Sequence, residues 1–513
     1  PVVASVVGSV VAPTIASAAP TTMPYSKVAI TDASLSEEEL MITPPPARRT
    51  KSMDDLLDDA GGFGAAQALT TAFAFACFVV HGAQVMSMAF VAPAAATLDF
   101  ADSPTQMKLT GSFFFAGWLL GLFLWGRVAA RRGWLAALFF VEAGVAVAGC
   151  APAAAPSARS FLLARFLCGV AEGGVPTTSF GWAGEFLLPR HKTRVGIVLQ
   201  MGFQLGSLLF TVSFSALGAA EWRLLSAGVS LCAVPLAVVA ALLPESPRWL
   251  LRAGRAKDSA NVVRTLARMN SRGDLAAGEG SDLDSPTGKG AAGAGAAAGK
   301  DKPGLVALVL ADRALRRVML VLGFHWLVYA ALFFGISLRE ASDLAATTRM
   351  VALQIPALAL TAVAFDAVGR RATMLTLLAG AAVSCAANSA ASAGLVAASA
   401  TAIASFTALG SVCMGAAFAG GYILSAEVLP TDVRALGLSA CSQCARVGGF
   451  VSPLLLLIDE SSATVPYAIW AALALAAGVA TLALPETLGE PSIESVAELR
   501  QLMARQLGAG LAP

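Results

Sequence analysis

The residues best suited to chemistry in this sequence are six ionisable side chains that lie within long apolar runs. The six are His81, Glu142, Arg165, Glu172, His325 and Arg446. A charged group inside a membrane costs about 2.5–3.5 kcal/mol on insertion scales, so a group retained there usually has a function. A histidine can exchange a proton near neutral pH, and the planar fork of an arginine matches a carboxylate. If the apolar runs cross a membrane, these residue types therefore predict proton transfer and binding of an ion.

The sequence does not indicate other kinds of reactive centre. The three histidines lie far apart, and neither a zinc-binding nor a nucleotide-binding spacing occurs. All eight cysteines fall inside apolar runs, which is typical of buried thiols rather than disulfides. A nucleophile next to a general base is also missing from the sequence pattern. We therefore expect no enzyme activity, no metal and no cofactor.

The elements that must position these side chains are helices within a membrane. The chain of 513 residues is 57% hydrophobic and 13% charged, against about 45–50% and 25% in soluble proteins. So few charges could not cover the surface of a soluble protein of this length. The net charge of +2 also excludes a strongly basic nucleic-acid binder.

Twelve apolar runs are long enough to cross a bilayer, which takes about 20 residues per helix. They are continuous rather than alternating, which favours helices over barrel strands. The predicted fold is an all-α membrane protein with twelve transmembrane helices. The runs lie near residues 66–96, 107–128, 134–155, 160–186, 194–219, 222–244, 314–338, 347–367, 372–391, 394–427, 434–458 and 463–485.

The distribution of basic residues predicts the orientation of the chain. With the N-terminus in the cytoplasm, only five of the 35 basic residues face outside and two lie within spans, so 28 are cytoplasmic. This satisfies the positive-inside rule, whereas the opposite orientation would invert the ratio. Both termini are therefore expected in the cytoplasm, in the plasma membrane or in an internal membrane such as the vacuole, a vesicle or the plastid envelope.

The spans divide six and six around a polar centre. Residues 1–65 are expected to be a disordered cytoplasmic segment, with an acidic patch at Glu37, Glu38 and Glu39. Residues 66–244 and 314–486 would form the two six-helix bundles. The cytoplasmic loop 245–313 would hold an amphipathic helix and a flexible Ala/Gly linker at 291–299, and residues 487–513 a cytoplasmic tail.

Landmarks in the first six spans recur in the second six at a nearly constant offset. Gly133 precedes Gly369 by 236 residues, and Glu185 precedes Glu427 by 242. The sequence Pro-Glu-Ser at 244–246 recurs as Pro-Glu-Thr at 485–487, an offset of 241. The repeat therefore predicts two pseudo-symmetric bundles, which can rock about a central cavity and expose it to each side in turn.

Several motifs resemble the major facilitator superfamily, and within it the branch of organic cation and anion transporters and synaptic-vesicle-protein-two-related transporters. They are Arg165-Phe-Leu-Cys-Gly-Val-Ala-Glu-Gly-Gly174, Pro244-Glu-Ser-Pro-Arg-Trp-Leu-Leu251, Phe334-Gly-Ile-Ser-Leu338, Glu427-Val-Leu-Pro-Thr-Asp-Val-Arg434 and Arg446-Val-Gly-Gly449. The resemblance covers residues 66–490. The second motif is shared with sugar porters.

This resemblance implies a cytoplasmic gate of carboxylates and guanidinium groups. Two residues of the first-half signature depart from the family pattern, because Ala130 replaces an aspartate and Trp134 an arginine. The alternative is that the arginines only enforce the topology. The gate residues would be Gly126, Arg131, Gly133, Glu185, Arg194, Glu245 and Arg248 in the first half, and Asp366, Gly369, Arg370, Arg371, Glu427, Arg434 and Glu486 in the second.

The resemblance also places the first and seventh spans around the cavity, where His81 and His325 stand at matching positions 244 residues apart. They could titrate during transport or be neutral and bonded between helices. Candidate proton-coupling residues are His81, Glu142, Arg165, Glu172 and His325. Candidate substrate-binding residues are His81, Gln84, Gln204, His325, Trp326, Tyr329, Gln354, Tyr422, Gln443 and Arg446.

At the position of Arg446, anion- and carnitine-carrying relatives have arginine and cation-carrying relatives have aspartate. The resemblance therefore implies a transporter of a small organic anion or zwitterion that works by alternating access, with or without coupled protons. Arg446 could instead pair with Glu142 or Glu172. A proton-coupled sugar porter and a non-transporting ligand sensor remain alternatives. The expected partners are the organic ion, protons and the lipid bilayer, for a monomer that binds no nucleic acid.

Overall fold

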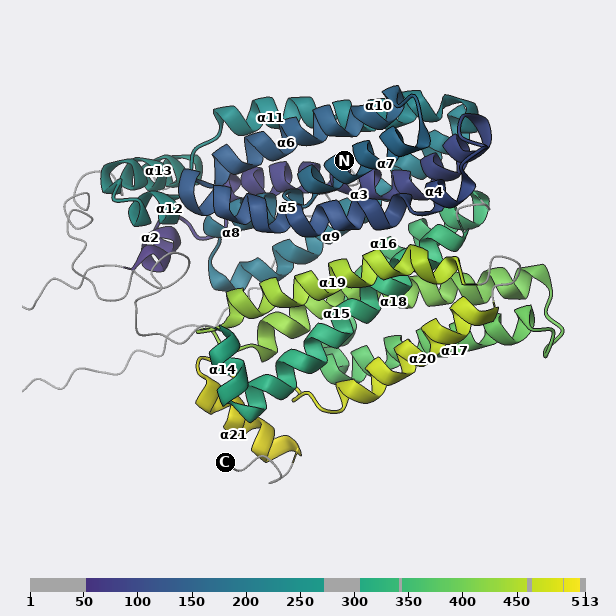
Figure 1. The fold of residues 1–513 in the computed structure, drawn as a ribbon. Helices are drawn as coiled ribbons and strands as arrows, with labels where there is room; N and C mark the ends of the chain where they lie inside the picture. Colours follow the sequence, from purple (N-terminus) through teal and green to yellow (C-terminus); the bar gives the residue numbers. More distant parts are fainter. Residues whose placement is uncertain (1–51, 272–304, 341–343, 459–463, 492, 508–513) are drawn as a thin grey trace, which may run out of the picture.

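The computed structural model describes residues 52–271, 305–340, 344–458, 464–491 and 493–507, and every regular element in these ranges is a helix. The long helices run roughly side by side in two bundles (Figure 1). A helix satisfies all its backbone hydrogen bonds within one segment, as lipid requires. The all-helical prediction is confirmed.

The first bundle follows the predicted order of six spans. Its helices are α3 (Ala65–Leu98), α5 (Thr110–Arg132), α6 (Trp134–Cys150), α7 (Ala158–Glu172) continued by α8 (Val175–Glu185), α9 (Pro189–Leu217), and α10 (Trp222–Leu231) continued by α11 (Ala233–Leu242). Short connecting helices are α4 (Pro104–Lys108), η2 (Ala151–Ala154) and η3 (Ala219–Glu221).

The second bundle repeats this arrangement. Its helices are α15 (Arg313–Glu340), α16 (Leu344–Val368), α17 (Arg370–Ser392), α18 (Ala400–Val428), α19 (Arg434–Leu456) and α20 (Thr464–Thr481). Ten helical segments in the described ranges are long and apolar enough to cross a membrane. The fourth predicted span is not among them because it is broken into α7 and α8, nor is the eleventh, α19, which carries Arg434 and Arg446.

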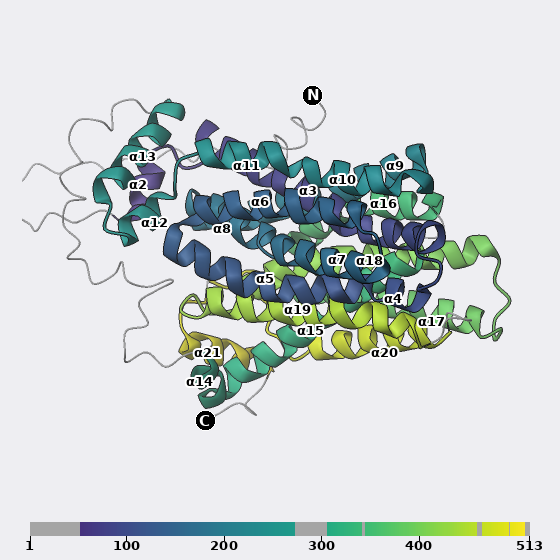
Figure 2. The same ribbon diagram turned by 45° about the horizontal axis from the view of Figure 1, so that its top comes forward.

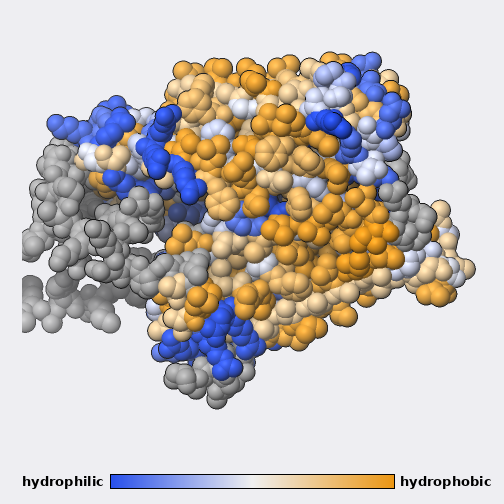
Figure 3. Space-filling model, viewed as in Figure 1, coloured by the Kyte–Doolittle hydropathy of each residue, from blue (hydrophilic) through white to orange (hydrophobic). Residues whose placement is uncertain are grey.

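Five further helices lie at the same end of the molecule, three beside the first bundle and two beside the second, and we call this end the cap end (Figures 1 and 2). They are α2 (Met53–Asp59), α12 (Pro247–Arg252), α13 (Ala256–Met269), α14 (Leu305–Ala311) and α21 (Val496–Leu507). Hydrophilic side chains gather over these helices, whereas a broad hydrophobic belt covers the spans (Figure 3). This distribution suits a belt in contact with lipid and a cap end in water.

The prediction of disorder for residues 1–65 is wrong for its last part. Ser52 and Asp55 form a capping box at the start of α2, and Leu56 and Leu57 are buried. Residues 1–51, with the acidic patch at Glu37–Glu39, and the linker at 291–299 lie outside the described residues. The many charges of α2 favour a prediction of disorder, although its capping box is a local sequence signal for the start of a helix.

The two bundles meet most closely near the end opposite the cap. Ser112 Oγ donates a hydrogen bond to the Phe450 carbonyl at 2.9 Å, which joins α5 to α19. One turn further along α5, the ring of Phe115 lies 4.5 Å from that of Phe334 on α15. Ion pairs among the described residues each lie within one half. Apolar and backbone contacts, rather than salt bridges, therefore hold the halves together here.

Candidate functional site

A cavity lies between the two bundles and draws its lining from both. The lining residues are Phe78, His81, Trp118, Pro176, Gln200, Phe203, Gln204, Phe333, Phe334, Leu358, Gly415, Phe418, Ala419, Tyr422 and Arg446. Its volume of about 40 Å³ suffices for one or two water molecules but not for an organic solute. Substrate binding would therefore require the halves to move apart.

The guanidinium group of Arg446 is the fixed charge of this cavity. Its Cζ lies 4.0 Å from the ring centroid of Trp118, a close cation–π contact across the two halves. The Tyr422 hydroxyl lies beside it. No carboxylate of the described residues forms an ion pair with Arg446, and its Nε has no hydrogen-bond partner there. The alternative in which Arg446 pairs with Glu142 or Glu172 is not what the structure shows.

His81 and Glu172 form a buried pair at the edge of the cavity. Nδ1 of His81 lies 2.5 Å from Oε2 of Glu172, and the two side chains are 3% and 0% exposed. Glu172 is the last residue of α7, directly before the Gly-Gly break that separates α7 from α8. Its other oxygen, Oε1, has no hydrogen-bond partner among the described residues. The pair therefore keeps free acceptor capacity in a dry environment.

Glu142 is a second buried carboxylate nearby. It lies on α6 and is 1% exposed, and both its oxygens lack a hydrogen-bond partner within the described ranges. Its neighbours are Cys77 and Glu172. Two carboxylates that share a buried region cannot both be ionised without a large cost.

Arg165, a candidate proton-coupling residue, lies on α7 away from the cavity lining. One of its terminal nitrogens donates to Ser87 Oγ at 3.2 Å, and its Cζ lies 5.3 Å from the ring centroid of Phe161. Arg165 and Glu172 do not pair, although they are two turns apart on α7. Arg165 therefore ties α7 to α3 outside the cavity lining.

The two symmetric histidines point to different surroundings. His81 faces the cavity, whereas His325 Nε2 bonds the Ala477 carbonyl at 2.9 Å and Thr481 Oγ1 at 3.2 Å, both on α20. The two histidines occupy matching positions along pseudo-equivalent helices, but their side chains point in different directions about the helix axes. His325 therefore matches the alternative in which a histidine is bonded between helices.

Of the ten candidate substrate-binding residues, four line the cavity: His81, Gln204, Tyr422 and Arg446. Three others bond to neighbouring helices instead. Gln84 donates to Ser230, Trp326 to Ser425 and Gln354 to Ser411. Tyr329 is buried, with a hydroxyl that has no partner among the described residues, and stacks with His325. Gln443 is half-buried on α19 outside the lining.

The sequence reasoning missed most of the aromatic lining. Trp118, Phe203, Phe334 and Phe418 are part of the walls, and behind the lining Phe115 stacks on Trp118 with the two rings at 8°. These aromatic residues come from spans of both halves, so no single span of the sequence marks them as neighbours. The cavity is thus an aromatic box with one fixed positive charge.

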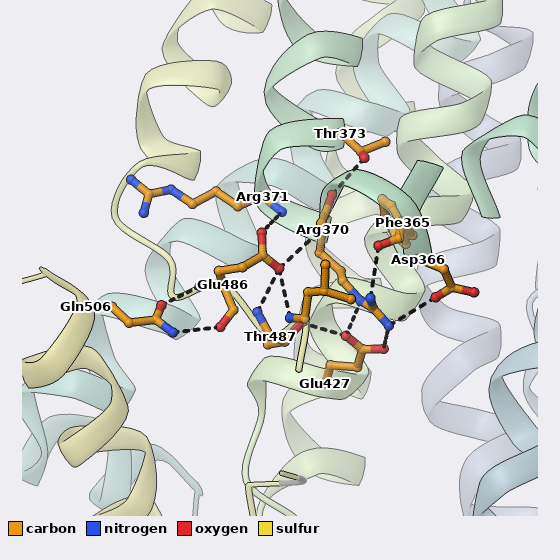
Figure 4. Close-up of polar contacts among 11 residues, drawn as sticks. Phe365, Asp366, Arg370, Arg371, Thr373, Glu427, Glu486, Thr487 and Gln506 are labelled. Atoms are coloured by element: carbon orange, nitrogen blue, oxygen red, sulfur yellow. Dashed lines mark hydrogen bonds and ion pairs between the residues drawn. The ribbon is translucent and has the colours of Figure 1, made fainter. Parts of the chain in front are cut away.

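The second-half gate is a connected network at the cap end (Figure 4). Arg370 forms a fork on Glu427, with nitrogen–oxygen distances of 2.8 and 3.1 Å, and lies 3.5 Å from Asp366. Thr487 Oγ1 also donates to Glu427 at 2.6 Å. These contacts join the ends of α16, α17, α18 and the chain after α20.

Glu486 caps the N-terminus of α17 in the same network (Figure 4). Its carboxylate accepts from the backbone N–H groups of Arg370 and Arg371 at 3.0 and 2.9 Å. Burial alone would raise the pKa of Glu486, but the backbone N–H donors outweigh it and the pKa falls below its usual value. Gly369 makes this approach possible, because its φ is +105° and a Cβ there would meet the carboxylate.

The first half repeats the cap with different partners. Glu245 accepts from the Leu135 N–H at 3.1 Å at the start of α6, beside Gly133 with φ +101°. Here burial dominates and raises the pKa of Glu245 despite the backbone donors. Glu185 is held by Arg252 at 3.2 Å and by Ser246 at 3.2 Å. Trp134 occupies the position of Arg370, so an arginine from α12 replaces the missing one from α6.

The structure does not bring every gate candidate into these networks. Arg131 and Arg194 are exposed and pair with no carboxylate of the described residues. A Cβ on Gly126 would meet nothing within 4 Å. Arg248 bonds the Glu185 carbonyl at 3.0 Å and Asp54 of α2 at 2.5 Å. Arg434 bonds the carbonyls of Leu429 and Ile493 at 3.0 and 3.3 Å.

Known proteins with the same fold include the xylose transporter XylE from E. coli. Its inward open structure superposes with a TM-score of 0.67 at 16% identity and covers 86% of this chain and 100% of that chain. At this identity the likeness shows the fold alone. It confirms the predicted major facilitator fold.

Curated relatives lie in the organic ion branch. Solute carrier family 22 member 20 of Mus musculus is 28% identical over 406 residues, which is 78% of this chain and 71% of the relative. The organic cation transporter protein of Drosophila melanogaster is 28% identical over 389 residues, which is 75% of this chain and 70% of the relative. The family model described as "Sugar (and other) transporter" matches residues 59–282 and 339–498. The chain therefore belongs to this transporter family of the major facilitator superfamily, in the branch of organic ion transporters.

Proposed function

We propose that this protein is a secondary transporter of a small organic anion or zwitterion, with an aromatic part, that works by alternating access. Arg446 is the observation that carries the proposal. A buried guanidinium that faces a cavity without a carboxylate partner among the described residues leaves a positive charge to be balanced. An organic anion supplies that balance and can form a fork with it.

The aromatic walls support the second part of the proposal. Trp118 lies against the guanidinium, and Phe203 and Phe418 line the same cavity from the two bundles. Rings of this kind bind flat apolar solutes with centroid distances of about 4.5–7 Å. A sugar offers many hydroxyl groups, whereas most of this lining is aromatic or aliphatic and its polar side chains are Gln200, Gln204, Tyr422, His81, Arg446 and the indole N–H of Trp118. The lining therefore favours an amphiphilic ion over a sugar.

The test uses the purified full chain in detergent with four ligands of similar size. They are benzenesulfonate, which stays ionised, benzyltrimethylammonium, the zwitterion phenylalanine and D-xylose. A ligand that binds the native state raises the melting temperature by mass action. We expect stabilisation by benzenesulfonate or phenylalanine and saturable uptake of the same compound into proteoliposomes.

Two variants of Arg446 separate a substrate role from a structural one. Arg446→Lys keeps the charge and loses the fork, so anion affinity should fall on the order of tenfold, whereas Arg446→Asp should abolish anion binding. Stabilisation by D-xylose or by the cation alone would overturn the proposal. Binding without uptake would identify a sensor of the same fold.

A further inference from the structure

We infer that the His81–Glu172 pair is a proton-binding site whose occupancy controls the affinity of the cavity for the organic anion. The inference rests on the proposed function and specifies its coupling ion. The 2.5 Å contact, the burial of both side chains and the place of His81 in the cavity lining carry it. Binding of one proton changes the net charge of the pair from −1 to 0.

The geometry connects this charge to the anion site. The ring of His81 lies 5.0 Å from that of Trp118, edge to face, and the Arg446 guanidinium lies 4.0 Å from the same ring. The Arg446 guanidinium, to which the anion would bind, is therefore within about 9 Å of the imidazole. A unit charge at that separation, at an effective dielectric constant of about 20, changes affinity on the order of tenfold.

The sign of the coupling follows from these charges. Before protonation, the pair contributes one negative charge near the anion site and repels an anion. After protonation the repulsion is gone, so the anion binds more tightly. By linkage, a bound anion must hold the proton more tightly by the same factor. The transported unit is then the anion together with one proton, moved in the same direction.

The pair lies next to the break between α7 and α8, where a change in its protonation can affect the conformation of the fourth span. Glu172 ends α7, and Pro176 in the first turn of α8 lines the cavity. Broken helices at the level of a binding site are a recurring feature of secondary transporters. Loss or gain of the ionic bond to α3 therefore acts where the fourth span can bend.

Other titratable groups lie near the pair, and the experiment must distinguish their protonation from that of the pair. The faces of α5, α8 and α9 that line the cavity near His81 carry uncharged side chains. The titratable and charged groups near the pair on its own helices α3 and α7 and on α6, α18 and α19 are Cys77, Arg165, Cys168, Glu142, Tyr422 and Arg446. Of these, Glu142 is the competing proton carrier, because its carboxylate is buried with both oxygens unpartnered within the described ranges.

The experiment measures benzenesulfonate affinity by thermal shift of the full chain between pH 5 and 8, with phenylalanine as the second probe. In the wild type we expect affinity to fall on the order of tenfold across this range as the proton is lost. Glu172→Gln keeps the size and removes the charge, so affinity should become independent of pH and stay at its acidic value. His81→Gln leaves the Glu172 carboxylate in place, so it should shift the pH at which the affinity changes without abolishing the change.

His325→Gln is the matched comparison, because this histidine bonds α20 and does not line the cavity. Its pH profile should be that of the wild type. A flat profile in the wild type, or a profile lost in Glu142→Gln but kept in Glu172→Gln, would overturn the inference while leaving the proposed function intact. Failure of both probes to bind at any pH would instead remove the proposed function.

Fold defects are separated from coupling by a second readout. Each variant is compared with the wild type for melting temperature without ligand and for the proton released or taken up when benzenesulfonate is added to weakly buffered protein. With a tenfold coupling, linkage predicts that the wild type takes up at most about half a proton per anion, at the pH where the affinity changes, and Glu172→Gln none. Equal proton uptake by both proteins would contradict the assignment.

Discussion

At the scale of single residues, the structure gives a physical reason for the two most regular landmarks of the sequence repeat. Gly133 and Gly369 adopt φ values of +101° and +105°, with ψ near 160°. This region of backbone conformation is essentially restricted to glycine. Each glycine lies directly before a helix whose first N–H groups bond a carboxylate. The glycine is therefore required by the backbone geometry at this point.

Substitution of these glycines tests that requirement. Gly369→Ala combines a disfavoured backbone conformation with a Cβ that would lie 2.7 Å from Glu486 Oε2, so we expect a loss of about 1–3 kcal/mol of stability. Gly126→Ala is the control, since a Cβ there meets nothing within 4 Å. It should leave the melting temperature unchanged or raise it slightly. Equal melting temperatures for the two variants would show that the turn tolerates a side chain.

The residue scale also shows where sequence reasoning reached its limit. The position of Arg446 in the cavity followed from its motif, and the buried carboxylates from their apolar surroundings. The pairing of Glu172 with His81 rather than Arg165 did not follow, because spacing along α7 fixes a face but not the neighbour opposite that face. For the same reason the matching positions of His81 and His325 concealed their different orientations.

At the scale of elements, the N-termini of α17 and α6 are each capped by a glutamate, but the balance of burial and backbone donors differs between the two glutamates. Glu486 caps α17 and Glu245 caps α6, each by accepting from backbone N–H groups. An ionised carboxylate at a helix N-terminus is favourable. Burial opposes it, and the opposite directions of the two pKa shifts show that the donors prevail at Glu486 and burial prevails at Glu245.

The two caps should therefore respond to acid in opposite ways. A lowered pKa at Glu486 means that its contribution to stability is complete above its usual pKa of 4.5 and is lost as the pH falls through the lowered value. The raised pKa of Glu245 means that its ionisation costs stability at neutral pH, a cost that disappears as the pH falls through the raised value. Glu486→Gln should thus lower the melting temperature at pH 7 more than Glu245→Gln does.

Melting curves of both variants and the wild type from pH 4 to 8 check this expectation. The deficit of Glu486→Gln should shrink towards pH 4, because the wild type then loses the same charge. The deficit of Glu245→Gln should instead be smallest near neutral pH and grow towards acid. Parallel curves for the two variants would show that the caps are electrostatically equivalent.

The elements themselves were largely predictable, since span lengths and caps follow from hydropathy and from a few turn residues. The break in the fourth span is encoded by Gly173, Gly174 and Pro176 but interrupts an otherwise continuous apolar run. The helix α2 was missed because its charges outweigh two buried leucines in any compositional average. The use of Arg252 for the absent arginine at Trp134 depends on tertiary packing of α12, which local sequence does not specify.

At the scale of the whole molecule, the halves touch most tightly far from the cap end. Gly449 of α19 packs on the ring of Phe115 of α5, where a Cβ would come within 2.8 Å of the ring atoms. The same ring stacks on Trp118 and contacts Phe334, so it cannot yield freely. This contact is therefore a closed seam on one side of the cavity, and alternating access requires it to open.

A larger side chain at the seam should drive the molecule towards the opposite state. Gly449→Leu would force α5 and α19 apart, and rigid bundles that rock about the cavity would then approach each other at the cap end. Spin labels at Arg159 and Thr401, opposite the cap, should move apart by several ångströms, and labels at Ala130 and Val368, at the cap end, should come closer. Pulsed electron–electron distance measurements on a version without native cysteines give both distances.

Gly228→Leu is the control, because a Cβ there meets nothing within 4 Å, and its distances should equal those of the parent. Separation at one end without approach at the other would mean that the bundles bend locally instead of rocking, because a rigid lever cannot open on one side of its pivot and stay unchanged on the other.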